Sequence, residues 1–264
     1  MKPILMLGAG RMGGALIEGW RAAGAFSGAD LIIRDPFPGP AAEAAEREGA
    51  RLNPPDSTLA EARTVLVCVK PQIWREAAAE TAPWLASGAI VVSIAAGVTA
   101  KDLALEFGGR CVARVMPTTA VAIGQGAASV YADEPEARAR AHALFQPVAQ
   151  VVDFLDERLM HAATAVSGSG PAYLYAFIEA LEASALEAGL TADAARALAR
   201  STIGGAAALL TQSGEDPAEL RRQVTSPGGT TEAALKVLMG EAGLSTLMRE
   251  AVAAAVRRSK ELGA

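Results

Sequence analysis

Short apolar runs alternate with amphipathic stretches through the first part of the chain. Runs of four to six mostly apolar residues predict strands at 4–7, 31–34, 64–69, 90–94, 111–115, 127–131 and 151–154. Between these runs, the spacing of apolar positions predicts helices at 11–23, 41–48, 73–85, 101–107 and 136–145. This alternation is typical of a doubly wound α/β sheet with helices on both faces.

The pattern changes after Leu155. The β-branched runs end, and long periods rich in alanine and leucine predict helices at 171–188, 192–212, 217–224, 231–239 and 245–262. We therefore predict an α/β domain over residues 1–155 and an all-α domain over residues 156–264. Gly204 and Gly205 fall inside one of the predicted helices, where each costs about 1 kcal/mol relative to alanine. Close helix packing, for instance across a dimer, would compensate for that cost.

Composition and charge narrow the class of protein. The 264 residues are 51% hydrophobic, with a mean hydropathy of +0.25, which predicts a globular protein with extensive buried surface. No apolar run approaches the ~20 residues of a membrane span, and the first four-residue run is too short for a signal peptide, so we expect a cytoplasmic protein that binds no membrane. The net charge of −5, without a basic run, argues against nucleic-acid binding. Cys68 and Cys111 are expected to be buried thiols, and no metal site is expected.

A G-x-G-x-x-G motif follows the first predicted strand directly, at Gly8, Gly10 and Gly13. The first glycine allows a tight turn, the second lets a pyrophosphate approach the backbone, and the third lets the helix pack on the strand. Free N–H groups at the start of the following helix favour phosphate. The alternative is a tight strand-to-helix turn that binds no ligand. The position of the motif, between the first predicted strand and a predicted helix, favours a dinucleotide site of the Rossmann type.

The end of the second predicted strand, Arg34-Asp35, is expected to contact the adenine ribose. An acid there accepts hydrogen bonds from the ribose hydroxyls, which favours NADH, whereas an arginine pairs with the 2′-phosphate of NADPH. The alternative is a solvated pair of residues at a strand end. The choice between NADPH and NADH therefore stays open. Two later strand-end loops also offer close approach to a cofactor: Cys68-Val69-Lys70-Pro71 and Ala95-Ala96-Gly97.

Two hydroxyl-rich loops enter helices of the second predicted domain, at residues 167–173 and 225–232. Free N–H groups at such a helix start can bind a carboxylate, although capping alone is the alternative. Residues 162–235 contain no lysine and no histidine, so the usual proton donors for carbonyl reduction are missing there. A protonated imine, which brings its own proton, fits better. His142 and His161 are expected to be structural or solvent-facing.

Taken together, these motifs resemble those of the pyrroline-5-carboxylate reductases. The resemblance rests on residues 8–13, 69–71, 93–98, 166–173 and 226–231. It implies NAD(P)H-dependent reduction of 1-pyrroline-5-carboxylate to L-proline, with the nucleotide on the first domain and the substrate near the domain interface. It also implies a homodimer built by intertwined C-terminal helices, often assembled further into a decamer.

The resemblance assigns roles to individual residues. Thr231 would be the catalytic residue, hydrogen-bonded to the pyrroline nitrogen. The substrate carboxylate would be held by Ser226, Gly228, Gly229 and Thr230. The cofactor would be bound by Gly8, Ala9, Gly10, Arg11, Met12, Gly13, Arg34, Asp35, Cys68, Val69, Lys70, Pro71, Ala95, Ala96 and Gly97.

The chain departs from the family at Thr118 and Ala120, where an asparagine and a proline are usual. We expect an altered cofactor affinity or geometry there, with activity retained. Two other hypotheses compete. A β-hydroxyacid dehydrogenase shares the architecture but needs a lysine on a helix of the second domain, and a nucleotide-sensing module would bind cofactor without turnover.

Overall fold

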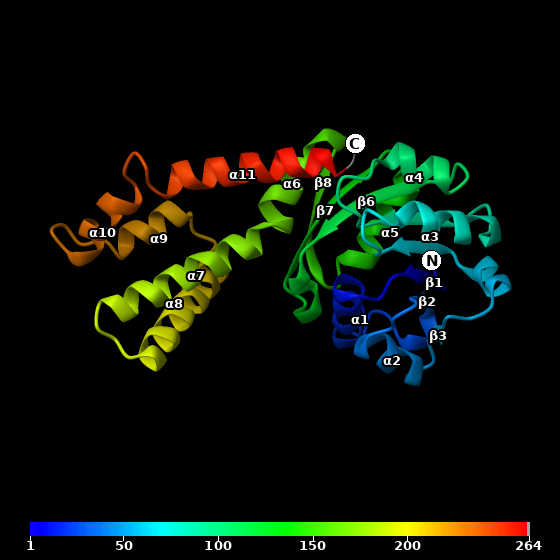
Figure 1. The fold of residues 1–264 in the computed structure, drawn as a ribbon, viewed down its shortest axis with the longest axis horizontal. Helices are drawn as coiled ribbons and strands as arrows, with labels where there is room; N and C mark the ends of the chain where they lie inside the picture. Colours follow the sequence, from blue (N-terminus) through cyan, green and yellow to red (C-terminus); the bar gives the residue numbers. More distant parts are fainter. Residues whose placement is uncertain (263–264) are drawn as a thin grey trace. The chain divides into compact units, whose positions relative to one another are not determined.

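A computed structural model of the chain describes residues 1–262 (Figure 1). The chain divides into two compact units. The first comprises Met1–Gly168 and the C-terminal segment that begins at Ala255, and the second comprises Ser169–Ala254. Within the described residues, no helix combines the length and the apolar character that a membrane span requires.

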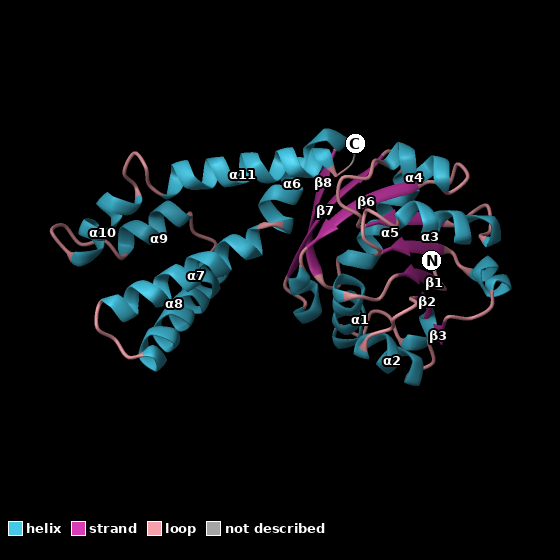
Figure 2. Cartoon of the chain, in the orientation of Figure 1, coloured by secondary structure: helices cyan, strands magenta, loops and turns pink. Residues whose placement is uncertain are grey.

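The first unit contains an eight-stranded sheet in the order β3-β2-β1-β4-β5-β6-β7-β8 (Figure 2). All neighbours are parallel except β6 and β7, which are antiparallel. The strands are β1 (Ile4–Leu7), β2 (Leu31–Arg34), β3 (Arg51–Leu52), β4 (Thr64–Val67), β5 (Ile90–Ser93), β6 (Val112–Pro117), β7 (Gly126–Ala132) and β8 (Ala149–Phe154). The predicted doubly wound sheet of the Rossmann type is confirmed.

Helices cover both faces of this sheet and create two hydrophobic cores. In β1, Ile4 and Met6 belong to one core, and Leu5 and Leu7 belong to the other. A strand buried on both faces explains why the sequence shows a continuous apolar run instead of alternation. The first core contains residues of α1 (Arg11–Ala22), α2 (Pro40–Arg47) and α5 (Pro135–Phe145). The second contains residues of α3 (Trp74–Thr81), α4 (Ala100–Glu106) and α6 (Met160–Ala163).

The strand order reverses at β1, whose neighbours are β2 on one side and β4 on the other. Ligands of open α/β sheets bind at the carboxyl ends of the strands beside such a reversal. The glycine motif leaves β1 at this point, and the loop that begins at Cys68 leaves β4 beside it.

The first unit extends beyond the last strand. A short 3-10 turn, α6 and the π-helical turn Thr164–Gly168 all belong to it. The Thr164 hydroxyl donates to the Met160 carbonyl at 2.7 Å, and a side chain at Gly168 would lie 3.3 Å from the sulfur of Met116 in β6. This close approach to β6 explains why the compact unit continues past Leu155.

The described part of the second unit has helices as its only regular elements, as predicted. They are α7 (Gly170–Glu187), α8 (Ala192–Ser213), α9 (Pro217–Gln223), α10 (Thr230–Leu238) and the start of α11 (Leu244–Glu261). Helices α7 and α8 pack against each other. No residue of α7 is buried within the chain, although the helix is rich in leucine, alanine and aromatic residues.

Candidate functional site

The three glycines of the motif after β1 lie in different surroundings. Gly8 has a φ of +91°, in the left-handed region, and a Cβ there would lie 3.0 Å from Val69 Cγ1. A Cβ at Gly13 would lie only 2.4 Å from the Gly8 carbonyl oxygen, so α1 meets the loop at backbone contact. A Cβ at Gly10 would meet nothing within 4 Å. The structure therefore leaves open space over the second glycine, where a ligand can approach the backbone.

The start of α1 offers unpaired donors beside that space. Gly10 is the N-cap and provides no side-chain hydrogen bond, and the first helical bond runs from the Gly14 N–H to the Gly10 carbonyl at 2.7 Å. Within residues 1–262 we find no acceptor for the backbone N–H groups of Arg11, Met12 and Gly13. Three unpaired N–H groups at the positive end of a helix dipole form an anion site.

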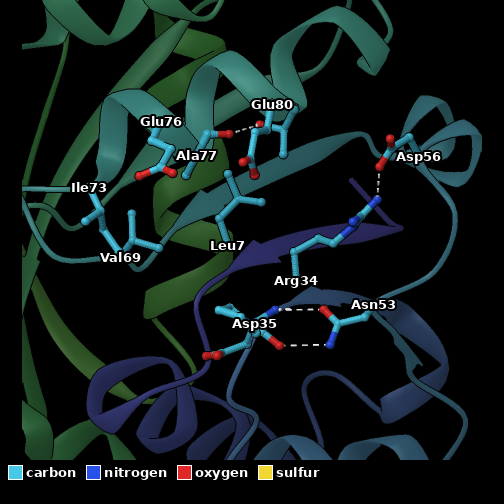
Figure 3. Close-up of a pocket in the computed structure, with 12 residues that line it drawn as sticks. Leu7, Arg34, Asp35, Asn53, Asp56, Val69, Ile73, Glu76, Ala77 and Glu80 are labelled. Atoms are coloured by element: carbon cyan, nitrogen blue, oxygen red, sulfur yellow. Dashed lines mark hydrogen bonds and ion pairs between the residues drawn. The ribbon is translucent and has the colours of Figure 1, made fainter.

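Asp35 ties the end of β2 to the glycine loop. The residue is 9% exposed, and its Oδ2 accepts the Ala9 N–H at 2.6 Å while its Oδ1 accepts the Phe37 N–H at 2.8 Å. The Asn53 side chain in turn bonds both peptide groups of Asp35, accepting from the N–H at 3.0 Å and donating to the carbonyl at 2.8 Å (Figure 3). The alternative of a solvated Arg34-Asp35 pair is therefore wrong.

The partner of Arg34 is Asp56, from the 3-10 segment Asp56–Glu61, and the two side chains form a short ion pair (Figure 3). The Arg34 Nε is buried and has no hydrogen-bond partner in the described structure. The guanidinium is thus oriented by a residue that lies more than twenty positions away in the sequence. Neither Asn53 nor Asp56 was predicted, because nothing local in the sequence marks them as partners of residues 34 and 35.

A cavity of about 630 Å³ opens between the end of β2 and α3 (Figure 3). Of the predicted cofactor residues, Arg34, Asp35 and Val69 line it, whereas Lys70 and Gly97 do not. The other lining residues are Leu7, Pro36, Asn53, Asp56, Ile73, Glu76, Ala77, Glu80 and Thr81. The cavity combines an apolar surface from Leu7, Val69 and Ile73 with charged groups at its edge.

The loops after β4 and β5 continue the sheet towards the same edge. The Cys68 N–H donates to the Leu7 carbonyl at 2.8 Å, and burial raises the pKa of the Cys68 thiol, which stays protonated. The Ala95 N–H donates to Ser93 Oγ at 3.2 Å, and Gly97 has a φ of +82°. Lys70 is exposed. These loops lie at the carboxyl ends of neighbouring parallel strands.

The family departure at Thr118 has a structural consequence. The side chain is buried, its Oγ1 accepts the Ala127 N–H at 3.0 Å, and its own N–H donates to the Ala127 carbonyl at 2.9 Å. The hydroxyl thus joins the end of β6 to the start of β7.

In the second unit, residues 226–231 form a turn that leads into α10. Gly228 has a φ of +71°, and the Gly229 N–H donates to the Ser226 carbonyl at 3.0 Å. Gly229 is the N-cap of α10, again without a side-chain bond, and the first helical bond comes from Ala233. No acceptor is found, anywhere in the described chain, for the backbone N–H groups at positions 230–232.

Glu232 stabilises this turn in a way that the sequence did not reveal. Its Oε2 accepts the Gly228 N–H at 2.6 Å, and its other oxygen lies 3.7 Å from Lys236 Nζ. The carboxylate therefore fixes the glycine turn and leaves the N–H groups of the helix start available. The other hydroxyl-rich loop, residues 167–173, begins with a hydroxyl that is already used within the chain. The Ser167 hydroxyl donates to the Ala163 carbonyl at 2.9 Å.

Both histidines have structural partners. His142 Nε2 lies 2.9 Å from Asp153, and His161 Nδ1 lies 3.0 Å from the hydroxyl of the buried Ser259 in α11. Burial and the nearby charge of Arg114 lower the pKa of His161. Across residues 1–262 there is no group of three or more His, Cys, Asp or Glu side chains that could hold a metal ion.

Comparison with known proteins places this arrangement in a family. A family model described as pyrroline-5-carboxylate reductase dimerisation matches residues 157–262, and one described as NADP oxidoreductase coenzyme F420-dependent matches residues 3–97. The chain is 37% identical to the pyrroline-5-carboxylate reductase of Synechocystis sp. over 98% of its own length and 97% of the relative. The chain belongs to the pyrroline-5-carboxylate reductase family.

Solved members of the family share the whole fold. The Coxiella burnetii pyrroline-5-carboxylate reductase superimposes with a TM-score of 0.89 at 30% identity, covering 100% of this chain and 99% of that one. The Plasmodium falciparum pyrroline carboxylate reductase, solved with NADP bound, superimposes with a TM-score of 0.85 at 25% identity. The match covers 100% of this chain and 98% of that one. Family membership confirms the resemblance inferred from the motifs and disfavours the β-hydroxyacid dehydrogenase alternative.

Proposed function

We propose that this protein reduces 1-pyrroline-5-carboxylate to L-proline with NADPH or NADH, the final step of proline biosynthesis. The observation that carries the proposal is the pair of uncapped helix starts in a chain of this family. One follows the open glycine motif at α1, and the other follows the glycine turn at α10.

The cofactor fits the first unit. Open space over Gly10 and the unpaired N–H groups of Arg11, Met12 and Gly13 suit a pyrophosphate. Asp35 suits the ribose hydroxyls, because each carboxylate oxygen has a second lone pair beyond the backbone N–H that it accepts. The reduced nicotinamide supplies a hydride when bound. The loops that begin at Cys68 and Ala95 are proposed to position it.

The substrate groups come from the second unit. The N–H groups at the start of α10, within residues 226–232, would bind the pyrroline carboxylate, and the Thr231 hydroxyl would accept a hydrogen bond from the protonated imine nitrogen. Hydride adds to the imine carbon, and the electron pair of the C=N bond moves to nitrogen, which keeps its proton. No further proton donor is needed, in agreement with the lysine-free and histidine-free segment 162–235.

We also propose that the protein forms a homodimer through its helical segment. Leu174, Tyr175 and Leu186 of α7 are 44%, 61% and 47% exposed in the isolated chain. A Cβ at Gly204 or Gly205 of α8 would meet nothing within 4 Å in this chain. Large apolar side chains that a helix leaves exposed side by side favour burial by a neighbour, and a second copy supplies one. The decamer and the cytoplasmic location implied above stay predictions, as do the domain limits 1–155 and 156–264.

Turnover tests the proposed activity directly. The purified protein is mixed with 1-pyrroline-5-carboxylate and either reduced nucleotide, and nucleotide oxidation is followed by absorbance while proline is measured by chromatography. We expect one proline for each nucleotide oxidised. A nucleotide-sensing module would bind the nucleotide without consuming it, and an absence of turnover with both nucleotides would overturn the proposal.

A further inference from the structure

The cavity beside β2 has an unbalanced charge. Four carboxylates line it, against a single guanidinium. The carboxylates come from three separate elements: Asp35 follows β2, Asp56 begins a 3-10 segment, and Glu76 and Glu80 lie on α3. The cavity adjoins the glycine motif, because Asp35 bonds the Ala9 N–H within that motif.

The one cation of the cavity is already engaged. Arg34 forms its ion pair with Asp56 through Nη2, and its buried Nε has no hydrogen-bond partner in the described structure. A phosphate could bind this guanidinium only by competing with the Asp56 carboxylate, which already forms an ion pair with it. Arg34 therefore contributes little free positive charge to a ligand.

Asp35 is held in a fixed orientation at the end of β2. The two backbone N–H groups on its oxygens and the Asn53 side chain on its peptide groups fix its orientation. It is 9% exposed, so it cannot turn away into solvent. A carboxylate held in this way accepts hydrogen bonds from free ribose hydroxyls and repels a phosphate ester at the same place.

The opposite wall adds two further negative charges. Glu76 and Glu80 are one helical turn apart on α3, and both line the cavity opposite Asp35 (Figure 3). No ion pair joins either side chain to a cation in residues 1–262. A phosphate in the cavity would thus face carboxylates on both walls.

From this arrangement we propose that the enzyme selects NADH over NADPH, with Asp35, Asp56, Glu76 and Glu80 as the residues that exclude the 2′-phosphate. The inference rests on the proposed function, because it assigns the cavity to the adenine ribose of the cofactor. It goes further by naming which nucleotide the site takes.

The expected selectivity follows from charge. A 2′-phosphate adds about −1.5 to −2 charges at neutral pH. Repulsion between this phosphate and the cavity carboxylates would weaken the binding of NADPH and leave the binding of NADH unaffected. Since the cavity is open to solvent and screened, we expect NADPH to bind about 10-fold more weakly than NADH at low ionic strength. Added salt should narrow this ratio, because screening weakens the repulsion.

Binding to the enzyme without pyrroline tests the proposal separately from turnover. NADH and NADPH are titrated against the protein, and nicotinamide fluorescence reports each Kd. Tighter NADH binding with a ratio that shrinks in salt supports the proposal. Equal Kd values, or tighter NADPH binding, overturn it while the proposed reaction stands. If neither nucleotide binds, both the reaction and the selectivity are wrong, and if NADH binds without turnover, only the reaction is wrong.

Charge-neutralising variants identify the residues responsible. Asp56→Asn releases Arg34 and removes one carboxylate, so NADPH affinity should rise about 10-fold with NADH affinity within about twofold. The double variant Glu76→Gln with Glu80→Gln should act in the same direction. Glu61→Gln is the matched control, since Glu61 ends the same 3-10 segment and pairs with Arg51 at 2.7 Å but does not line the cavity. If no cavity variant raises NADPH affinity above that of the control, the proposal is overturned.

Discussion

Replacing Gly10 by alanine separates cofactor binding from folding. The φ of Gly10 is −66°, outside the left-handed region that favours glycine, and a Cβ there would meet nothing within 4 Å. The free energy of unfolding should therefore change by less than about 0.5 kcal/mol. The added methyl group fills the space through which a pyrophosphate reaches the N–H groups at the start of α1.

The loss of binding can be estimated from the contacts at stake. A hydrogen bond from a backbone N–H to a charged phosphate contributes about 1.5–3 kcal/mol, and losing one corresponds to about a 10- to 100-fold increase in the Kd for NADH. The Kd is measured by nicotinamide fluorescence, and stability by urea denaturation followed through the buried Trp20.

Gly13→Ala is the matched control with the opposite expectation. Its Cβ would lie 2.4 Å from the Gly8 carbonyl oxygen, so the loop or the helix must move, at a cost of about 1–3 kcal/mol in stability. Wild-type NADH affinity in Gly10→Ala would refute the assignment of the pyrophosphate to this space. Equal destabilisation by both substitutions would refute the difference in packing between the two glycines.

Substitutions at three further positions test the roles proposed for Thr231, Glu157 and His161. Thr231→Ala should lower kcat/KM about 10-fold or more, because one oriented hydrogen bond to the substrate is lost. Thr231→Ser keeps the hydroxyl and should retain most of the wild-type kcat/KM. Unchanged kinetics in Thr231→Ala would remove the residue from the mechanism. Glu157→Ala removes the ion-pair partner that lies 2.9 Å from the buried Arg114, so the free energy of unfolding measured with urea should fall by about 2–3 kcal/mol. An unchanged free energy of unfolding would show that this ion pair does not stabilise the fold. Because burial lowers the pKa of His161 in the folded state, the unfolded chain binds the proton more readily, so stability should fall as the pH drops below about 6.5. His161→Gln should flatten that fall, and an unaltered pH profile would exclude His161 as its source.

Buried strands with sharp ends could be predicted from the sequence. The limits of β1 and β2 match the predicted runs 4–7 and 31–34, because each run starts with at least three buried apolar residues and ends before a glycine or a proline-containing turn. The strand predicted over 64–69 ends instead at Val67, where the chain turns to bring Cys68 and Val69 against Gly8. The two-residue β3 was missed, because a half-buried pair at the sheet edge gives no periodic signal.

The candidate site was predictable only as far as local motifs reach. The glycine motif, the strand-end loops and the turn before α10 all have short sequence patterns. The contacts of Asp35 with Ala9 and Asn53, and of Arg34 with Asp56, join residues 18 to 26 positions apart. Side-chain spacing along one element does not encode such contacts. The sequence therefore did not show whether Arg34 or Asp35 determines the choice of nucleotide, because that depends on which charges face the cavity.

Transfer of a labelled hydride tests the central claim most directly. The enzyme is incubated with 1-pyrroline-5-carboxylate and NADH that carries deuterium at the transferable position, and proline is analysed by mass spectrometry. We predict singly deuterated proline, with the label on the ring carbon that was double-bonded to nitrogen. Bound nucleotide with unlabelled or absent proline would contradict the assignment of this protein as an imine reductase.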